Sequence, residues 1–348
     1  MLNTARKALQ QLSPPPGYVQ SIVDDGMDRA GAVNIAFKDT VLLIGGWAYY
    51  DGAVPKGMKN DIWEVRELSS LGDGKTDLGQ YRMYRMLQEH CNFPPRSNHA
   101  CCVARDGTLY LTGGRLHPSR IEGLLNDMWM SQDGVNWELV CEECPWSARH
   151  SHAMCPCPDS FGDILLLAGQ GGHIEGGWES FNDVWRFVKD RGTWEILTTA
   201  AEWGKRTMPT VRCGPQGELA LCGGEVIYPE VAQCTFNELD EPTLSDVWRS
   251  RDGGRSWQCA CEEGPFPKTR AQWLVYLPRN SMYVLFGQRE GVNRAEARVY
   301  TSVDLSRWDL LAEDALGDKI RVVATQLEIK HILHKDDGTL IFLTSLLA

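Results

Sequence analysis

The sequence predicts an all-β fold built from one repeated unit of four short strands. Two observations predict it. First, short runs of β-branched and aromatic residues are separated by Gly, Asp and Pro turns, without the 3.6-residue apolar period of a helical repeat. Second, a hydrophobic stretch that ends in a glycine pair or near-pair recurs, as VLLIGG (41–46), TLYLTGG (108–114), ILLLAGQ (164–170), LALCGG (219–224) and MYVLFGQ (282–288).

Three further marks complete each unit. Downstream of four glycine sites come an acid, an aliphatic residue and a tryptophan, in NDIW (60–63), NDMW (126–129), NDVW (182–185) and SDVW (245–248). An aromatic residue follows, at Tyr84, Trp137, Trp194, Trp257 and Trp308. An arginine comes 12 or 13 residues after each aromatic, at Arg96, Arg149, Arg206, Arg270 and Arg321. The regular spacing indicates one supersecondary unit with variable loops.

The marks assign four strands to each unit in chain order. One strand follows the arginine, one ends at the glycines, one carries the DxW and one carries the last aromatic. Units of about 50–60 residues with four strands are typical of propeller blades. Arg29 opens the first unit and Arg321 opens a sixth, in which GTLIFLTS (338–345) matches the second strand. We therefore expect a six-bladed β-propeller with four-stranded blades.

The two ends of the chain are expected to share the last blade. The sixth unit has no outer strands before the chain stops at Ala348, and YVQSIV (18–23) is strand-like. We expect this N-terminal strand to close the ring as the outer strand of the last blade, which would remove exposed sheet edges. The propeller then forms a single domain over residues 18–348, after an N-terminal extension over residues 1–17.

The repeated residues resemble kelch repeats. The resemblance is carried by the glycine pair, the DxW, the outer tryptophan, and RSNHA (96–100) and RHSHA (149–153) on the first strand. It covers nearly the whole chain after residue 17. The fifth unit departs from the pattern, because ARVY (297–300) replaces the DxW, and two of the five glycine sites read GQ.

A second resemblance concerns the turn between the third and fourth strands. SRDGGRSW (250–257) is similar to the Asp-box hairpin turn of sialidases and related propellers, with looser copies at SQDGVNW (131–137) and SVDLSRW (302–308). In such turns the aspartate accepts hydrogen bonds from backbone amides. We expect a structural role for these aspartates, and for the tryptophans a packing role.

The arginines that open the first strands are expected to meet at one channel mouth. The second strand returns to the same face, so the long loops after the glycines overhang them. A basic, aromatic-rich funnel indicates an anionic ligand, because guanidinium binds carboxylates bidentately, and in some kelch proteins arginines at this position hold acidic residues of a peptide. The predicted ligand-binding residues are Arg29, Arg96, Arg149, Arg206, Arg270, Arg321, Trp47, Tyr49, His117, His173, Trp178 and Tyr228.

The same arginines have an alternative role as struts. Acids precede them at repeating offsets, and a paired arginine would join blades rather than hold a ligand. The candidate partners are Glu89, Glu142, Glu202, Glu262 and Glu313.

Metal and cofactor signals are weaker. A zinc-like spacing is found among Cys141, Cys144, His150, His152, Cys155 and Cys157. The same strand slot holds Cys101 and Cys102 in the neighbouring blade, so cysteine there is interpreted as a small hydrophobic filler. His99 and His152 share one repeat position, where we expect hydrogen bonding in the core or channel. We predict no metal and no cofactor.

Composition restricts the partners. The formal net charge of −11 argues against nucleic acid, and no apolar run approaches the length of a membrane span. The twelve cysteines, without a hydrophobic signal-peptide core, favour reduced thiols and a cytoplasmic monomer. The acid-poor, amphipathic N-terminal segment leaves import into an organelle as an alternative.

Three functions remain open at this point. A non-catalytic module that binds an acidic peptide partner or an anionic small molecule is favoured, because no triad, phosphate loop or metal-ligand set stands out. An enzyme on an acidic sugar is the alternative, since the arginines and Asp-box turns resemble sialidases and kelch-type sialic-acid isomerases. Its candidate residues, which no motif selects, are Tyr49, Tyr50, Glu175, Glu225 and Tyr228. A kelch metalloenzyme is the third, and its ligands cannot be mapped onto this chain.

Overall fold

A computed structural model gives the arrangement of the chain. It describes residues 19–22, 29–48, 57–67, 81–117, 120–172, 177–226, 243–266, 272–277, 281–289, 296–312, 327–334 and 340–346. The helices among these residues are two short 3₁₀ turns, η1 (Lys189–Arg191) and η2 (Pro215–Gly217), and the other elements are β-strands. No helix of the described part is long and apolar enough to cross a membrane. The prediction of an all-β fold is confirmed.

Four antiparallel sheets have the predicted four strands in chain order. One sheet contains β7 (Ala100–Val103), β8 (Leu109–Thr112), β9 (Met128–Ser131) and β10 (Glu138–Cys141). Another contains β12 (Ala153–Pro156), β13 (Ile164–Leu167), β16 (Val184–Val188) and β17 (Thr193–Thr198). The third contains β18 (Thr210–Cys213), β19 (Leu219–Cys222), β20 (Val247–Ser250) and β21 (Gln258–Cys261). The fourth contains β22 (Gln272–Leu277), β23 (Met282–Arg289), β24 (Glu296–Ser302) and β25 (Asp309–Ala312). A three-stranded sheet extends the β12 sheet, with β11 (Arg149–His150), β14 (Gln170–Gly172) and β15 (Trp178–Ser180).

The first sheet is larger than predicted, and the last is smaller. The first contains β1 (Val19–Ile22), β2 (Arg29–Ala30), β3 (Val33–Phe37), β4 (Thr40–Ala48), β5 (Gly57–Glu67) and β6 (Tyr81–Gln88). The last contains β26 (Leu327–His334) and β27 (Leu340–Leu346).

The predicted partner of the N-terminal strand is wrong. β1 pairs with β6, with Val19 opposite Tyr84, so it forms the outer edge of the first sheet rather than of the last. β6 is an outer strand whose second edge would otherwise present unpaired N–H and C=O groups, and β1 covers that edge.

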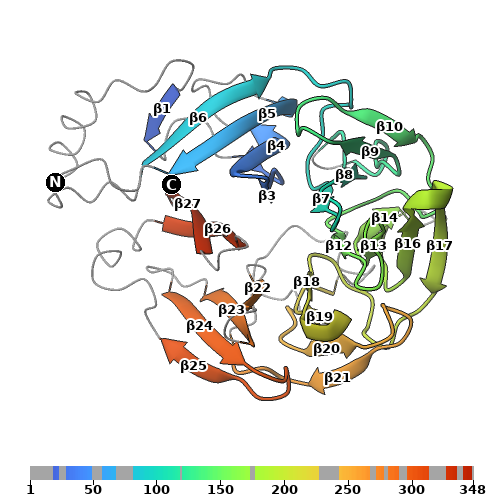
Figure 1. Ribbon diagram of the computed structural model, residues 1–348, viewed down its shortest axis with the longest axis vertical. Coiled ribbons are helices and arrows are strands. Elements are labelled where there is room, and N and C mark those ends of the chain that lie inside the picture. The colour runs from blue at the N-terminus through green and yellow to red at the C-terminus, as the bar shows by residue number, and fades with distance from the viewer. Residues whose placement is uncertain are drawn as a thin grey trace, which may run out of the picture.

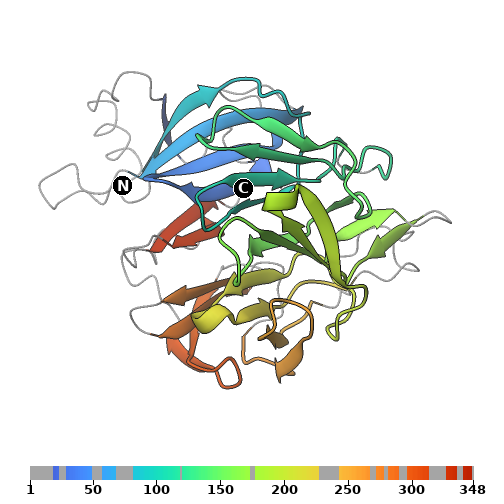
Figure 2. The ribbon, with the colours of Figure 1, turned by 45° about the vertical axis from the view of Figure 1, so that its right-hand side comes forward.

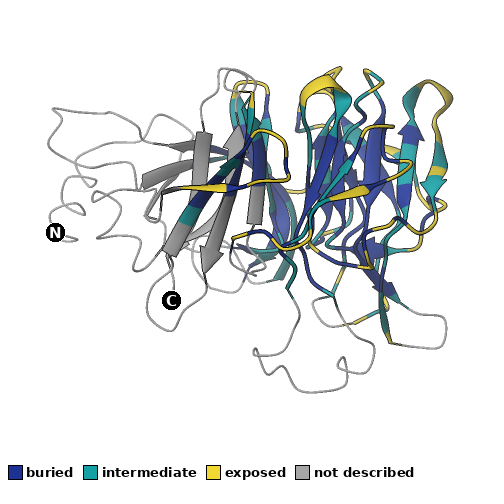
Figure 3. Ribbon diagram, turned by 90° about the horizontal axis from the view of Figure 1, so that it is seen from below, coloured by how far each residue is buried: buried dark blue, intermediate teal, exposed yellow. Residues whose placement is uncertain are grey.

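The sheets stand around a common centre (Figure 1). Strands β3, β7, β12, β18, β22 and β26 lie nearest the centre, and β10, β17, β21 and β25 lie at the periphery (Figure 1). The turned view shows neighbouring sheets facing one another (Figure 2). Buried residues concentrate in the strands, and exposed residues lie mainly in the turns (Figure 3). The arrangement is that of a β-propeller-like fold.

Apolar clusters fill the spaces between neighbouring sheets. Between the first and second sheets, Ile44 packs with Leu109 and Leu111. Between the second and third, Tyr110 meets Phe187 with ring centroids 5.8 Å apart. Similar clusters join the β12 sheet to the β18 sheet, and that sheet to the β22 sheet. Because successive side chains of a strand point to opposite faces, each of these central sheets is buried on both sides.

One glycine slot of the repeat is filled by alanine. Gly45, Gly113 and Gly223 occupy equivalent positions in the second strand or just after it, with φ of 57°, 56° and 63°, and Ala168 takes the same place with φ of 59°. The sequence alignment, which matched Gly169 to these glycines, is therefore one residue out of register. A left-handed backbone costs a residue with a Cβ about 1–2 kcal/mol, so the surrounding sheet must impose this conformation on Ala168.

Candidate functional site

The arginine that opens the first strand is bound by an aspartate of its own sheet in four units. Arg96 donates from Nη1 and Nη2 to the two carboxylate oxygens of Asp127, both at 2.6 Å, and to the Gly113 carbonyl at 2.9 Å. Trp129 Nε1 donates to the same aspartate at 2.7 Å. The arginine side chains are at most 2% exposed. The equivalent pairs are Arg29–Asp61, Arg149–Asp183 and Arg206–Asp246.

The main chain of the same arginine is bound to the preceding sheet. Arg96 N donates to the Lys59 carbonyl at 2.9 Å, and the Arg96 carbonyl accepts from Gly46 N at 2.8 Å. Arg149 and Arg206 make the same two kinds of bond to the sheets before them. Each of these arginines therefore joins two sheets, one through its main chain and the other through its guanidinium. This geometry supports the strut interpretation, and ligand contact by the predicted arginines stays a prediction.

The carboxylate partners differ from the glutamates expected. Glu89, Glu142 and Glu202 are exposed, and Glu202 instead accepts a hydrogen bond from Trp257 N at 3.0 Å. The DxW aspartate binds the arginine because it precedes the third strand, beside the end of the second strand that the guanidinium already contacts. Pairing with the preceding glutamate is therefore wrong for Arg96, Arg149 and Arg206.

Left-handed residues follow the arginines by two positions. Gly31, Asn98, Ser151 and Met208 have φ of 62°, 55°, 52° and 55°. Their main chains bind one to the next, from Asn98 N to Gly31 O at 2.7 Å, from Ser151 N to Asn98 O at 2.8 Å and from Met208 N to Ser151 O at 2.8 Å. We call these four residues the left-handed ring. Non-glycine residues in this conformation are strained, and such strain clusters at functional sites.

The left-handed ring carries polar side chains on the loop face. Asn98 Nδ2 donates to Ser151 Oγ at 3.1 Å, and His150 Nδ1 shares a hydrogen bond with the same hydroxyl at 2.9 Å. The predicted Trp178 packs edge-on against His150, with ring centroids 5.4 Å apart. Met208 is 41% exposed. Sequence reasoning missed this ring, although Gly, Asn and Ser two residues after an arginine were a signal, since these residues tolerate left-handed turns.

The histidines beside the left-handed ring have lowered pKa values. Burial, and then the charge of Arg115, lowers the pKa of His150 to about 3. Burial, and then Arg96, lowers the pKa of His99 to about 3. The pKa of His152 is lowered well below its usual value, first by burial and then by the arginine that opens its strand. All three imidazoles are therefore neutral near neutral pH.

His99 and His152 occupy equivalent positions with different polar neighbours. His152 Nε2 hydrogen-bonds Thr112 Oγ1 at 2.8 Å. The position equivalent to Thr112 in the first sheet is Ile44, and neither ring nitrogen of His99 has a hydrogen-bond partner among the described residues. The expected hydrogen-bonding role is therefore found for His152, and the repeat position alone does not guarantee it.

The other predicted loop residues lie only partly in the described part of the chain. Trp47 lies in β4 opposite Ala30 and Met58, and it is half-buried, as is His117. Glu225 is buried and bridges to Thr207. The remaining candidates lie outside the described residues, namely Tyr49, Tyr50, His173, Glu175, Tyr228, Arg270 and Arg321.

The described cysteines are free thiols, and most of them are buried or half-buried. Eleven cysteines are described, and all eleven are free. Cys102 and Cys155 belong to the apolar clusters between sheets. Burial, and then the neighbouring Cys141, raises the pKa of Cys144. In the described ranges no group of three or more His, Cys, Asp or Glu side chains is placed to hold a metal ion.

The opposite face carries the turns between third and fourth strands. Asp133 accepts hydrogen bonds from Val135 N at 2.8 Å and from Asn136 N at 2.7 Å. Although burial acts to raise it, hydrogen bonds from Asn136 and Val135 hold the pKa of Asp133 at about 2. Asp252 accepts from Ser256 N at 3.0 Å in the same way. These aspartates have the structural, amide-capping role expected of them.

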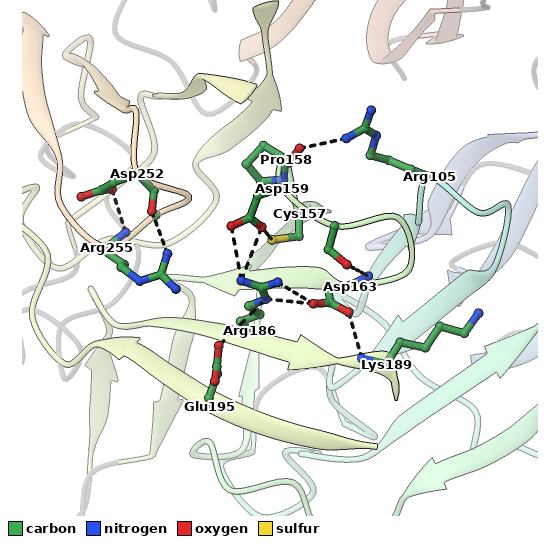
Figure 4. A network of polar contacts seen from close by, with 12 residues as sticks. Arg105, Cys157, Pro158, Asp159, Asp163, Arg186, Lys189, Glu195, Asp252 and Arg255 are labelled. Atoms are coloured by element: carbon green, nitrogen blue, oxygen red, sulfur yellow. Dashed lines mark hydrogen bonds and ion pairs between the residues drawn. The ribbon is translucent and has the colours of Figure 1, made fainter. Parts of the chain in front are cut away.

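An ion-pair network joins sheets on this opposite face (Figure 4). Arg186 binds Asp163 at 2.7 Å and approaches Asp159 at 3.4 Å. Asp163 also accepts from Lys189 N at 2.9 Å, and the Lys189 ammonium reaches Asp106 of the preceding sheet at 2.5 Å. Because these cations and carboxylates bind one another, the network indicates a structural role.

Comparison with known proteins bears on the fold. No family model matches the chain, and no curated protein matches it. The solved structure titled "Structure of YjhT" is similar over 82% of this chain and 84% of that chain, with a TM-score of 0.56 and 13% identity. A protein of unknown function from Dyadobacter fermentans DSM 18053 aligns over 86% and 88%, with a TM-score of 0.49 and 14% identity. The likeness to YjhT concerns the fold alone, and with the sheets around a common centre it defines the class as β-propeller-like.

Proposed function

We propose that the protein is a non-catalytic binding module, a closed six-bladed propeller of kelch type whose loop face binds an acidic peptide partner or an anionic small ligand. β3, β7, β12, β18, β22 and β26 lie nearest the centre in chain order (Figure 1), and β26 contacts both β22 and β3, which supports six blades and closure. The repeated glycine, DxW and arginine marks support the kelch assignment.

The sign of the charge at the left-handed ring carries the proposal of an anionic ligand. After burial, the next influence on the pKa of His99, His150 and His152 is in each case an arginine, which lowers it. A neighbouring cation lowers a histidine pKa because it disfavours the charged imidazole, but Arg96 and Arg149 are themselves paired with Asp127 and Asp183. An exposed cation on this face is Arg120, and on a chain with a net charge of −11 its charge supports the attraction of an anion to this face.

The same residues favour binding over catalysis. The hydrogen bond between Ser151 Oγ and His150 Nδ1, at 2.9 Å, places a hydroxyl beside an imidazole, the two groups that a nucleophile and its general base would use. A base with a pKa of about 3, however, is poorly matched to proton abstraction near neutral pH. The hydrogen bonds of the left-handed ring hold the main chain at Asn98, Ser151 and Met208, and a preorganised surface loses less entropy on binding.

Peptide binding tests this proposal. We expect a fluorescently labelled Glu-rich peptide to bind the full chain, with affinity that falls as salt rises, and a Lys-rich peptide of equal length not to bind. Arg120→Glu, at an exposed residue of the loop face, should weaken the Glu-rich peptide several-fold. Arg251→Glu is the matched control, because Arg251 is 67% exposed in a turn of the opposite face. Equal binding of the two peptides, or no binding of either, would contradict the proposal.

We further propose that the protein is a monomer of a reducing compartment such as the cytoplasm. Eleven free cysteines, several of them buried with raised pKa values, support this. Light scattering should give the mass of one chain, 39.0 kDa, and twice that mass would contradict the monomer.

A further inference from the structure

A row of polar side chains crosses the three-stranded sheet on the loop face. His150 of β11 pairs with Gln170 of β14, which pairs in turn with Ser180 of β15. Residues directly opposite one another in an antiparallel sheet point to the same side, with Cβ atoms about 4.5–5.5 Å apart. All three are buried, and none of the three belongs to the apolar clusters found between the described sheets. We call these three residues the polar row.

Apolar side chains border the polar row. Trp178 lies two residues before Ser180 on β15, so its side chain points to the same side of the sheet, and its ring centroid lies 5.4 Å from that of His150. Gly172 is the partner of Trp178 on β14, and a Cβ on Gly172 would lie 2.5 Å from Ile121 Cγ2 of the preceding sheet's loop. Trp178 and Ile121 are half-buried, so the polar row lies one side chain below the surface.

Two groups of the polar row lack a hydrogen-bond partner among the described residues, His150 Nε2 and Ser180 Oγ. The other ring nitrogen of His150 is held in place. Its Nδ1 shares a hydrogen bond with Ser151 Oγ at 2.9 Å, and that hydroxyl accepts from Asn98 Nδ2 at 3.1 Å. Buried polar groups nearly always have a hydrogen-bond partner, so a ligand that supplied partners to Nε2 and Oγ would lower the free energy of this region.

The chemistry of the polar row selects hydroxyl groups. The Ser180 hydroxyl and the Gln170 amide both donate and accept, and Nε2 of a neutral imidazole does one or the other according to its tautomer. A ligand hydroxyl matches all of them, whereas a carboxylate only accepts and an ammonium only donates. Because burial lowers the pKa of His150 to about 3, no member of the polar row is charged near neutral pH, and a buried ligand charge without a counter-charge is costly.

We propose that the polar row is a binding site for neighbouring hydroxyl groups of a neutral sugar or polyol. The hydroxyls bond His150 Nε2, Ser180 Oγ and the Gln170 amide, and the C–H face of the ligand packs against the Trp178 ring, which turns outward to admit it. The ligand is uncharged, so this site goes beyond the acidic peptide or anionic ligand proposed above and does not depend on it.

Nuclear magnetic resonance of the chain with isotope-labelled histidine tests the site where it lies. The His150 ring resonances are assigned by their absence in His150→Gln. They should shift along a saturating curve with D-glucose, D-galactose, D-xylose, ribitol or glycerol, and not with acetate. A response to the ring sugars alone identifies a sugar, and a response to ribitol or glycerol identifies an open-chain polyol. The resonance reports this site, whereas sugars and polyols raise the melting temperature of folded proteins in general.

Ser180→Ala separates binding from folding. Because the Ser180 hydroxyl has no partner among the described residues, its loss should leave the free energy of unfolding in urea unchanged or raised, and it should weaken the sugar or polyol about three- to tenfold. Ser306→Ala, at an exposed serine of the opposite face, is the matched control and should bind as the wild type does. The Glu-rich peptide should bind Ser180→Ala and the wild type equally, so failure of the peptide proposal and failure of this one are distinguishable.

Four results would overturn the proposal. The first is the absence of a saturating shift of the His150 ring with any of these sugars and polyols. The second is equal affinity of Ser180→Ala and the wild type. The third is a loss of stability in Ser180→Ala, which would show that the fold itself bonds this hydroxyl. The fourth is a response to acetate in place of the sugars and polyols, which would overturn the neutral class of ligand.

Discussion

Removal of the Arg149 guanidinium should destabilise the fold by about 3 kcal/mol. The side chain is fully buried and donates to Asp183 at 2.6 and 2.8 Å and to the Ala168 carbonyl at 2.9 Å, while its guanidinium lies 4.1 Å from the Phe181 ring centroid. Arg149→Met keeps much of the apolar contact, but Asp183 retains only the bond from Trp185 Nε1 at 2.7 Å among these donors. Loss of one member of a buried ion pair costs about 3–5 kcal/mol. Because Asp183 is 14% exposed, water should recover part of this loss.

Urea unfolding followed by tryptophan fluorescence measures this free energy. The double variant Arg149→Met/Asp183→Leu should recover most of the loss, because neither charge remains. Arg251→Met breaks an exposed pair with Glu218 and should cost less than about 1 kcal/mol. If Arg149→Met lost less than about 1 kcal/mol, or if the double variant were no more stable than the single one, the strut interpretation would be refuted.

Three further predictions concern the core and the turns. Thr112→Val leaves His152 Nε2 without its hydroxyl partner and should lower the free energy of unfolding by about 1–3 kcal/mol in urea; an unchanged midpoint would count against this hydrogen bond. The pKa of His150 is lowered from 6.5 to about 3. The contribution of His150 to stability should therefore be full above pH 6.5 and fall as the pH drops toward 3, because only the unfolded chain takes up the proton. His150→Gln should flatten this fall, and a His150 imidazole that titrates near pH 6.5 by NMR would contradict the prediction. The pKa of Asp133 is lowered from 3.8 to about 2, so its contribution should be present above pH 3.8 and disappear toward pH 2; Asp133→Asn should lose this dependence, and identical acid profiles of the two proteins would exclude it.

The repeated unit was predictable because its marks are local. The strands are short and the turns lie close to them in sequence. The glycine pair and the DxW therefore hold fixed positions relative to their strands, whatever the length of the loops between them. The partner of β1 was not predictable in this way. Both the first and the last sheet offered an edge, and the choice of β6 depends on a long-range contact that spacing does not encode.

The site was predicted less well, since it depends on which side chains are buried together. Arg96 lies just before the first strand of its sheet, but Asp127 and not Glu89 binds it, because an offset in sequence does not say which acid is buried. Ala168 was missed because the sheet forces it into a backbone conformation that its residue type disfavours.

The double attachment of Arg96, Arg149 and Arg206 makes each of their repeats a connector with two unlike ends. One end is the arginine main chain, which hydrogen-bonds the preceding sheet, and the other is the guanidinium, which binds the aspartate of its own sheet. Interfaces of this head-to-tail kind place no limit of their own on how many copies follow one another. A repeat can therefore be gained or lost without a new kind of interface between sheets. The number of repeats is then set by the angle between neighbouring sheets and not by the arginine contacts that join them.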